Sequence, residues 1–174
     1  MRSRRKTWRR ALAVLAVTAS VAAVAPGAGA QSRGRVSEAA GQYRITTFAN
    51  KCLDVARRSA EDDAPVIQYE CTGGPNQEFR FVPRGGDTFE IRTVAGKCLD
   101  VRGGIVADGT PVIQWGCNGG RNQLFRLRNV GDRRFEIGTF SGKCLDVRGG
   151  SLADETPIVQ WECNGRPNQV FRIL

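Results

Sequence analysis

Short runs of alternating hydrophobic and polar residues make up the chain from about residue 43 to residue 174. Between residues 89 and 94 the alternation has a period of two and is followed by Gly96, which is typical of a β-strand that ends in a turn. Turn sequences such as Gly103-Gly104 and Asp108-Gly109 separate the next runs. Four strands are therefore predicted in this segment, over residues 89–94, 97–101, 111–117 and 123–127.

This segment occurs three times in the chain. Residues 89–127 and 135–173 align without a gap and are identical at 26 of 39 positions, whereas the first copy is more divergent. The repeats cover about residues 43–82, 89–128 and 135–174. Three copies give about twelve short strands, and so many strands in so short a chain must close on themselves to hide their edges. The predicted class is all-β and closed.

Residues 1–30 have the pattern of a secretion signal peptide. Six of the first ten residues are basic, an apolar run follows over 11–24, and residues 28–30 have the small-x-small pattern of a cleavage site. The apolar run is shorter than the roughly 20 residues that span a bilayer, so no membrane span is expected. Arg4-Arg5 resembles the start of a twin-arginine signal, but Thr7 and Trp8 depart from that signal and favour the general secretory route. The remaining chain, with residues 31–42 as a linker, is expected to be extracellular.

Charge and composition exclude several functions. The formal net charge is +9, but 6 of the 26 basic residues lie in residues 1–30, which contain no acidic residue; the remaining 20 basic and 17 acidic residues give +3. So small an excess does not indicate nucleic-acid binding. The chain has no histidine, which excludes histidine general bases, Ser-His and Cys-His nucleophile pairs, and zinc sites that need an imidazole.

Six cysteines in an exported chain predict disulfides rather than metal ligands. The first cysteine of each copy lies 19 positions before the second and 46 positions before the first cysteine of the next copy. Pairing within each copy respects this symmetry. The expected disulfides are Cys52–Cys71, Cys98–Cys117 and Cys144–Cys163.

Three strings recur in each copy: Lys-Cys-Leu-Asp-Val, then Val-Ile-Gln-Trp-x-Cys-Asn-Gly, then Asn-Gln-x-Phe, with small variations. In the second copy they begin at Lys97, Val112 and Asn122. This tripled pattern resembles the ricin-type (R-type) lectin β-trefoil, which is also classed among bacterial carbohydrate-binding modules and carries Gln-x-Trp-like repeats. The resemblance implies a six-stranded barrel capped by three hairpins, with pseudo-threefold symmetry and one sugar pocket per copy.

The resemblance also implies a role for four residues in each copy. A pyranose ring has a flat apolar face and a rim of hydroxyl groups, so its pocket needs an aromatic platform and fixed polar groups. An aspartate would accept hydroxyl protons through charge-assisted hydrogen bonds, an aromatic ring would stack on the sugar, an asparagine would bridge a hydroxyl, and a glutamine would orient the aspartate. The expected sets are Asp54, Tyr69, Asn76 and Gln77; Asp100, Trp115, Asn122 and Gln123; and Asp146, Trp161, Asn168 and Gln169.

Structural roles remain open for the same residues. An aspartate in a turn can cap backbone N–H groups, and a tryptophan at a strand end is usually part of the core. The core role is better filled by the phenylalanines at the place where the family has tryptophan: Phe79, Phe125 and Phe171. The glutamines beside the aromatic platforms point to the opposite strand face and are interpreted as structural, bonded to hairpin backbone: Gln68, Gln114 and Gln160.

The first copy is the weakest pocket. Arg57 and Arg58 replace the two glycines of the other copies, so the loop after Asp54 is expected to follow another path. Residues 61–63 and the two arginines are interpreted as solvated loop charge, since the acidic run has no metal-ligand spacing.

A non-catalytic lectin for galactose-type sugars or plant polysaccharide such as xylan is the function that the resemblance implies, with carbohydrate as the partner and no cofactor. An enzyme is disfavoured because the motif aspartates would lie in three separate sites. Glycoside hydrolysis needs two carboxylates in one site. The alternative is a protein-binding β-trefoil, such as a secreted inhibitor or a toxin-delivery subunit, which would use its loops. Three copies of one pocket string are not explained by that alternative.

Overall fold

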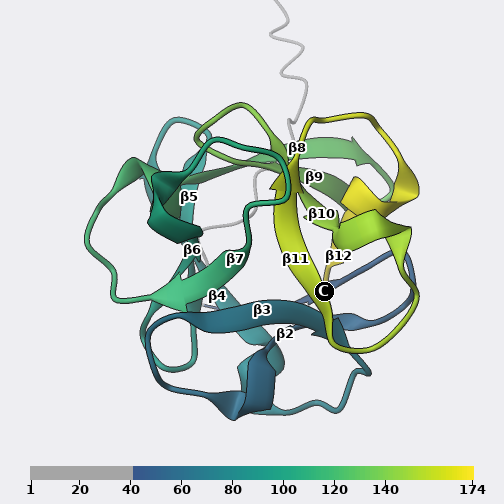
Figure 1. The fold of residues 1–174 in the computed structure, drawn as a ribbon, viewed down its shortest axis with the longest axis horizontal. Coiled ribbons are helices and arrows are strands. Elements are labelled where there is room, and N and C mark those ends of the chain that lie inside the picture. Colours follow the sequence, from purple (N-terminus) through teal and green to yellow (C-terminus); the bar gives the residue numbers. More distant parts are fainter. Residues whose placement is uncertain (1–40) are drawn as a thin grey trace, which may run out of the picture. The chain divides into compact units, whose positions relative to one another are not determined.

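The computed structural model describes residues 41–174 as twelve short strands in antiparallel pairings (Figure 1). The predicted signal peptide, residues 1–30, and residues 31–40 of the predicted linker lie outside the described residues. Within residues 41–174 no helix is long and apolar enough to cross a membrane. The strands are β1 (Tyr43–Thr46), β2 (Cys52–Val55), β3 (Ala64–Tyr69), β4 (Glu78–Gly85), β5 (Thr88–Thr93), β6 (Cys98–Val101), β7 (Val112–Trp115), β8 (Phe125–Gly131), β9 (Arg134–Gly138), β10 (Cys144–Val147), β11 (Thr156–Trp161) and β12 (Phe171–Ile173).

Six of these strands close into a barrel. The ring of pairs runs β1–β4–β5–β8–β9–β12 and returns to β1. Equivalent aromatic pairs lie opposite one another where each repeat's first and last strands meet: Tyr43 with Phe79, Phe89 with Phe125, and Phe135 with Phe171. The closed ring leaves none of these six strands with a free edge, as the all-β, β-trefoil prediction requires.

The other six strands form three hairpins, β2–β3, β6–β7 and β10–β11. Strand β3 pairs with both β7 and β11, and an isolated bridge joins Pro111 to Val159, so the three hairpins contact one another around the pseudo-threefold axis. Figure 1 shows β3, β7 and β11 around the centre of the view. The fold is the predicted β-trefoil of a barrel and three hairpins.

Phenylalanine, and not tryptophan, fills the core. Phe79, Phe125 and Phe171 are at most 1% exposed and belong to one hydrophobic cluster with inward-facing Ile and Leu side chains of the other strands. Trp115 and Trp161 are 40% and 43% exposed. The predicted core role of the three phenylalanines is therefore confirmed, and a core role for these tryptophans is excluded.

The strand predicted over residues 123–127 is wrong at its start. Gln123 lies in a single 3₁₀ turn, and β8 begins at Phe125 and continues to Gly131. Strand β7 is also shorter than the predicted 111–117. The turn bends the backbone before the core phenylalanine, so the Gln123 side chain points back toward the hairpin. The equivalent turns of the other repeats are Pro75–Gln77 and Pro167–Gln169. Three further short turns, at Ala56–Arg58, Arg102–Gly104 and Arg148–Gly150, contain left-handed residues.

The loop after Asp54 keeps the path that it has in the other repeats, which corrects the sequence expectation. Arg57 has φ 59° and Arg58 has φ 54°, and the glycines at the equivalent positions have φ between 63° and 65°. Both arginines thus adopt the left-handed region that favours glycine. The surrounding turn holds this backbone against the steric preference of the two side chains.

Each of the glutamines next to a platform joins its repeat to the preceding repeat in cyclic order. Gln160 donates its amide to the backbone carbonyls of Ile105 and Ala107 at 2.7 and 3.0 Å, and accepts from the hydroxyls of Thr139 and Ser141. The structural interpretation of these residues is confirmed, but the backbone that they bind belongs to a neighbouring repeat. Gln68 and Gln114 make the equivalent backbone bonds, to Ser151 and Ala153 and to Ser59 and Glu61.

Ion pairs repeat the same cyclic pattern. Asp62 pairs with Lys97 at 2.7 Å and accepts a hydrogen bond from the Gly116 N–H, so it is more than the solvated loop charge that the sequence suggested. The Lys97 contact is the main cause that lowers the pKa of Asp62. Equivalent pairs join Lys51 to Asp154 and Lys143 to Asp108.

The disulfides have the predicted pairing. They join Cys52 to Cys71, Cys98 to Cys117 and Cys144 to Cys163, and no free cysteine remains among the residues described. Each bridge links the start of one hairpin to the loop that follows it.

Candidate functional site

One aspartate lies on the first strand of every hairpin and is buried. Asp54, Asp100 and Asp146 are only 3–5% exposed. A glutamine amide from the following 3₁₀ turn donates to each carboxylate: Gln77 to Asp54 at 2.8 Å, Gln123 to Asp100 at 2.9 Å and Gln169 to Asp146 at 2.9 Å. The predicted Asp–Gln pairs are therefore in direct contact in all three repeats.

The glutamine also fixes the loop that carries it. Gln123 donates from the same amide nitrogen to the Gly116 carbonyl at 3.0 Å, and its amide oxygen accepts from the Asn118 N–H at 2.9 Å. All polar atoms of this fully buried side chain are thus engaged. A rigid glutamine holds the carboxylate in one orientation, which leaves the other lone pairs of the carboxylate for a ligand.

The asparagine before this glutamine supplies a second donor in two repeats. Asn122 donates to Asp100 at 2.8 Å, and Asn168 donates to Asp146 at 2.8 Å. All three asparagines also donate to a strand carbonyl, Asn76 to that of Val55 at 3.2 Å. In the first repeat the Asn76 Oδ1 is buried with no partner among the described residues.

Burial raises the pKa of all three aspartates above the ordinary value of 3.8. The amide hydrogen bonds from glutamine and asparagine act in the opposite direction, because they favour the ionised form. These carboxylates are thus strong acceptors at neutral pH that become protonated in acid more readily than exposed aspartates do.

The aromatic platforms end the second strand of each hairpin. Trp115 and Trp161 close β7 and β11 and are largely exposed, and Tyr69 closes β3 and is half-buried. Trp161 packs beside the second repeat, because a Cβ placed on Gly109 would lie 3.7 Å from its Cζ3. Each platform is therefore held beside its aspartate by the strand pairing of the hairpin.

Cavities occupy this space in the first and third repeats. A cavity of about 450 Å³ is lined by Asp146, Trp161 and Asn168. A larger one, about 600 Å³, is lined by Asp54, Tyr69 and Asn76. The first repeat has the larger cavity, although its sequence made it the weakest pocket.

Sequence reasoning missed several residues that line these cavities. Glu155 of the third repeat reaches the cavity of the first, and Phe48 of the first repeat reaches that of the third. Arg166 also lines the third cavity. The first two positions become visible only when the cyclic order of the repeats is known, since they lie far from the pocket motifs in the sequence.

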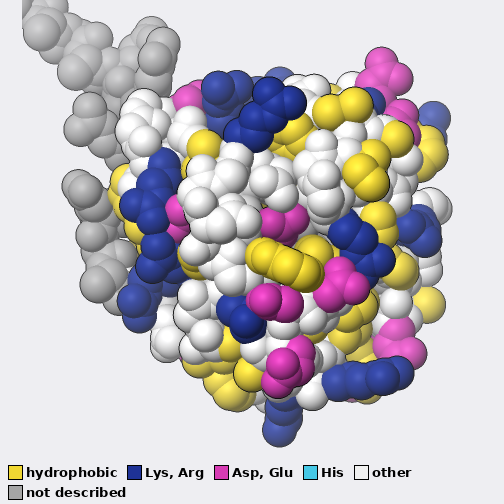
Figure 2. Space-filling view, turned by 60° about the vertical axis from the view of Figure 1, so that its left-hand side comes forward, with side chains coloured by type: hydrophobic (Ala, Val, Ile, Leu, Met, Phe, Trp, Pro, Cys, Tyr) yellow, Lys and Arg dark blue, Asp and Glu magenta, His cyan; other side chains and the backbone are white. Residues whose placement is uncertain are grey.

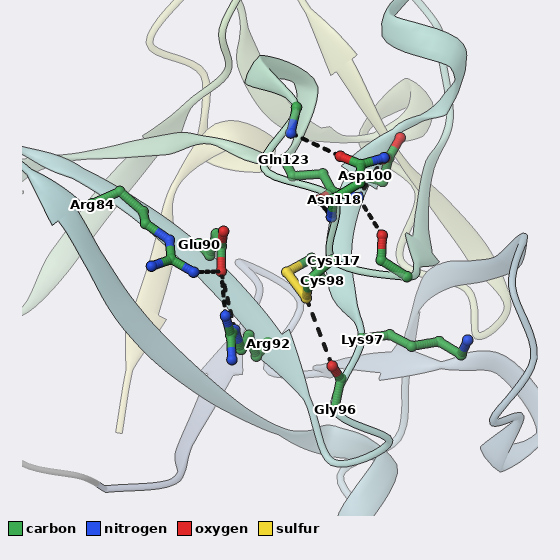
Figure 3. Close-up of a disulfide and its surroundings, with 12 residues drawn as sticks. Arg84, Glu90, Arg92, Gly96, Lys97, Cys98, Asp100, Cys117, Asn118 and Gln123 are labelled. Atoms are coloured by element: carbon green, nitrogen blue, oxygen red, sulfur yellow. Dashed lines mark hydrogen bonds and ion pairs between the residues drawn. A yellow bond between two sulfur atoms is a disulfide. The ribbon is translucent and has the colours of Figure 1, made fainter.

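One cluster has the residue types of a metal site. Glu90, Cys98 and Cys117 bring ligand atoms within 4.8 Å of one another. Both sulfurs are joined in a disulfide, and the Glu90 carboxylate is bonded by Arg84 and Arg92 (Figure 3). The cluster is therefore explained by a disulfide next to a buried ion pair.

The sequence matches two models of one protein family. Residues 87–174 match the ricin-type β-trefoil lectin domain, and residues 31–115 match the model described as ricin-type β-trefoil lectin domain-like. The chain belongs to the ricin-type β-trefoil lectins, and its domain is a carbohydrate-binding β-trefoil. No curated protein matches the chain.

Solved structures agree with this assignment. ThreeFoil, a designed threefold-symmetric protein, is 37% identical, with a TM-score of 0.75 over 76% of this chain and 97% of its own. The exo-β-1,3-galactanase 1,3Gal43A of Clostridium thermocellum is 32% identical, with a TM-score of 0.75 over 76% of this chain. The match spans only 30% of the galactanase. A ricin B-like lectin of Macrolepiota procera, solved with lactose, shares the fold at 23% identity and a TM-score of 0.65, over 79% of this chain and 96% of its own.

Proposed function

We propose that this protein is a secreted, non-catalytic lectin with up to three pockets, which binds galactose-type sugars or a plant polysaccharide such as xylan. The observation that carries the proposal is the tripled constellation of a buried aspartate, a glutamine that fixes it and an aromatic ring beside it. In the second and third repeats, the exposed faces of Trp115 and Trp161 have no core role to explain them.

Each residue of a pocket has a distinct task in this proposal. In the third repeat, Asp146 accepts hydrogen bonds from two sugar hydroxyls, while Trp161 stacks on the apolar face of the ring. Asn168 lies against the carboxylate at 2.8 Å and bridges to a hydroxyl. Gln169, which is fully buried, does not touch the sugar but keeps Asp146 in position.

Binding at a single pocket is expected to be weak. The stacked ring contributes on the order of 1 kcal/mol and each hydrogen bond to the carboxylate about 1.5–3 kcal/mol. Loss of the sugar's free motion opposes them by at least about 4 kcal/mol. A monosaccharide should thus bind with a Kd near about 1 mM, and a polymer that engages several pockets should gain a factor of about 10² to 10⁴.

The arrangement of carboxylates supports binding without catalysis. The three motif aspartates lie on three separate hairpins. Asp146 is the one carboxylate among the residues that line the third cavity. Glu155 of the third repeat reaches the first cavity. The corresponding residue of the second repeat, which lies beside the third cavity, is Gly109 and has no carboxylate. A pair of carboxylates, which glycoside hydrolysis requires, is therefore not a shared feature of the repeated pocket.

The cysteines and the amino-terminal sequence support secretion. Disulfides persist in oxidising compartments such as the extracellular space, and all six cysteines are paired. The basic and apolar segments of residues 1–30 have the order of a signal peptide.

A glycan array that includes galactosides, xylan oligomers and unrelated sugars tests the proposal. We expect retention of one sugar class by the protein and loss of that retention in a variant with Asp100→Asn and Asp146→Asn. Absence of retention on any glycan, together with capture of a protein partner, would support the protein-binding alternative.

A further inference from the structure

The three pockets differ in the positive charge that they present to a ligand. At the position of Arg58 the second and third repeats have Gly104 and Gly150. At the position of Arg166 the first and second repeats have Gly74 and Gly120. The first and third pockets therefore each contain one guanidinium from these two positions, and the second contains none.

The two arginines reach the same region of their pockets from opposite loops. The Nη2 of Arg58 lies 3.4 Å from the place where a Cβ on Gly74 would stand. The third repeat has a side chain at that place, Arg166, and a glycine at the position of Arg58. The guanidinium of Arg58 in the first pocket thus corresponds in place to that of Arg166 in the third pocket, although the two residues belong to different loops of the repeat.

Neither arginine is neutralised by an ion pair with a carboxylate of the described residues. Among residues 41–174 the guanidinium groups of Arg58 and Arg166 form no ion pair within 4.0 Å. Both line a cavity with the motif aspartate, and both help to lower the pKa of that aspartate against the effect of burial. The second aspartate, Asp100, receives no such effect from any arginine.

The arginines near the second pocket have other partners. Arg121 places its guanidinium over the Phe140 ring, 5.0 Å from the centroid. Arg102 forms an ion pair with Asp63 at 2.8 Å. These groups are occupied, so they do not supply the free positive charge found in the other two pockets.

Arg58 is also held in an unfavourable backbone conformation. Its φ of 54° lies in the left-handed region, where the other two repeats have glycine. A non-glycine residue retained in such a region points to a function for its side chain. Arg57 also lines this cavity, but Arg58 is the arginine whose charge acts on the Asp54 carboxylate.

We propose that the first and third pockets bind an acidic saccharide whose carboxylate or sulfate group is held by Arg58 or Arg166, while the second pocket binds a neutral sugar. This inference rests on the proposed lectin function. A planar guanidinium can bind either acidic group through two parallel hydrogen bonds. Glu155 lines the first cavity and opposes an anion there, so its replacement by glutamine should strengthen the acidic preference of that pocket.

The test compares galactose, galacturonic acid and galactose 6-sulfate in nuclear magnetic resonance titrations of the protein. The indole signals of Trp115 and Trp161 report on the second and third pockets, and the side-chain amide of Gln77 reports on the first. We expect the first and third pockets to bind an acidic sugar about fivefold to tenfold more tightly than galactose, as one partly exposed charge-assisted contact allows. The second pocket should not discriminate. The two acidic probes show whether carboxylate or sulfate is preferred.

Three variants assign the preference to single residues. Arg58→Gly should remove it from the Gln77 signal alone, and Arg166→Gly from the Trp161 signal alone. Arg58→Gly restores the residue that the other repeats carry at this φ, so folding is preserved. Gly104→Arg should create the preference at Trp115, because a Cβ there would lie an ordinary 3.8 Å from the Asn122 Cβ.

The outcomes separate this inference from the proposed function. Binding of galactose without an acidic preference in the first and third pockets would overturn the inference and leave the lectin function in place. An acidic preference that persists in Arg58→Gly and Arg166→Gly would also overturn it. Failure of every pocket to respond to these sugars or to xylan oligomers would overturn both.

Discussion

The side-chain amide of Gln123 lies 2.9 Å from the carboxylate of Asp100, although the two residues are 23 positions apart. Strand β6 carries the aspartate, and the 3₁₀ turn before β8 carries the glutamine. The contact joins the first hairpin strand of a repeat to the turn that leads into its core phenylalanine. The pocket and the packing of the core therefore depend on the same turn.

Acid should release the sugar before it unfolds the protein. The sugar hydroxyls donate hydrogen bonds to an ionised carboxylate, and burial raises the pKa of Asp100 and Asp146 above 3.8. As the pH is lowered, affinity should thus begin to fall while the pH is still above 3.8. Once the aspartate is mostly protonated, affinity should fall by about tenfold for each further pH unit. Titration of the Trp115 and Trp161 signals with sugar at several pH values measures this dependence.

The stability of the fold should respond to pH with the opposite sign. Because the pKa of each aspartate is raised in the folded state, folding favours the protonated form. The resulting contribution to the free energy of unfolding is fully present below pH 3.8 and is lost as the pH rises through the folded-state pKa. Burial would raise the pKa of Glu90, but the hydrogen bonds of Arg84 and Arg92 lower it below 4.5, so its contribution is lost only in stronger acid. An unfolding transition that coincides with the loss of sugar binding would contradict this prediction.

The tryptophans should act as platforms and contribute little to stability. We expect Trp115→Ala and Trp161→Ala each to abolish one pocket, because each ring is largely exposed beside its aspartate. The double variant should lose disproportionately more retention on a polysaccharide column, since avidity depends on the number of pockets engaged. Calorimetry with free sugar and circular dichroism check binding and folding. Wild-type retention by a folded double variant would show that these rings are not platforms.

The glutamine hydrogen bonds that join one repeat to another should differ in their contribution to stability. Gln160 uses both ends of its amide, whereas the Oε1 of Gln114 and the hydroxyl of Thr93 are buried with no partner among the residues described. Gln160→Ala should lower the free energy of unfolding by about 2–4 kcal/mol, from lost hydrogen bonds and an unfilled cavity. Gln114→Ala serves as the matched variant and should cost less. Urea unfolding measures both, and equal losses would argue against the difference in hydrogen bonding.

Each disulfide should stabilise its own repeat. A bridge that closes a loop of 19 residues contributes roughly 3 kcal/mol when the chain-entropy treatment holds. Replacement of Cys98 and Cys117 by alanine should lower the free energy of unfolding by about that amount, with the other two bridges intact. Peptide mapping without reduction provides the control, and a bridge between repeats would contradict the pairing.

Mixed charge on the surface is consistent with the small net charge of residues 31–174. The face shown in Figure 2 carries basic and acidic side chains interspersed with hydrophobic ones. Some basic residues are neutralised by ion pairs between repeats, such as Lys51 with Asp154.

Spacing and alternation in the sequence were enough to predict the repeat, most of the strand pattern and the disulfide pairing, because these features are local or repeated. The residues of the pocket motif came from the resemblance to ricin-type lectins and stay a prediction as a sugar site. The exposure of Trp115 and the burial of Phe125 also followed, because the two residue types occupy different places in the repeated string.

The way in which the repeats are joined, and the side chains that each pocket receives from other repeats, depend on tertiary packing that the sequence pattern does not reveal. Gln160 binds the backbone of residues 105 and 107, and Glu155 enters the cavity of the first repeat, because the hairpins pack in cyclic order around one axis. The left-handed path at Arg58 is likewise a property of the packed turn and overrides the preference of that residue. A repeat fixes its own geometry through local contacts, but the charge of each pocket depends on side chains that converge from separate loops.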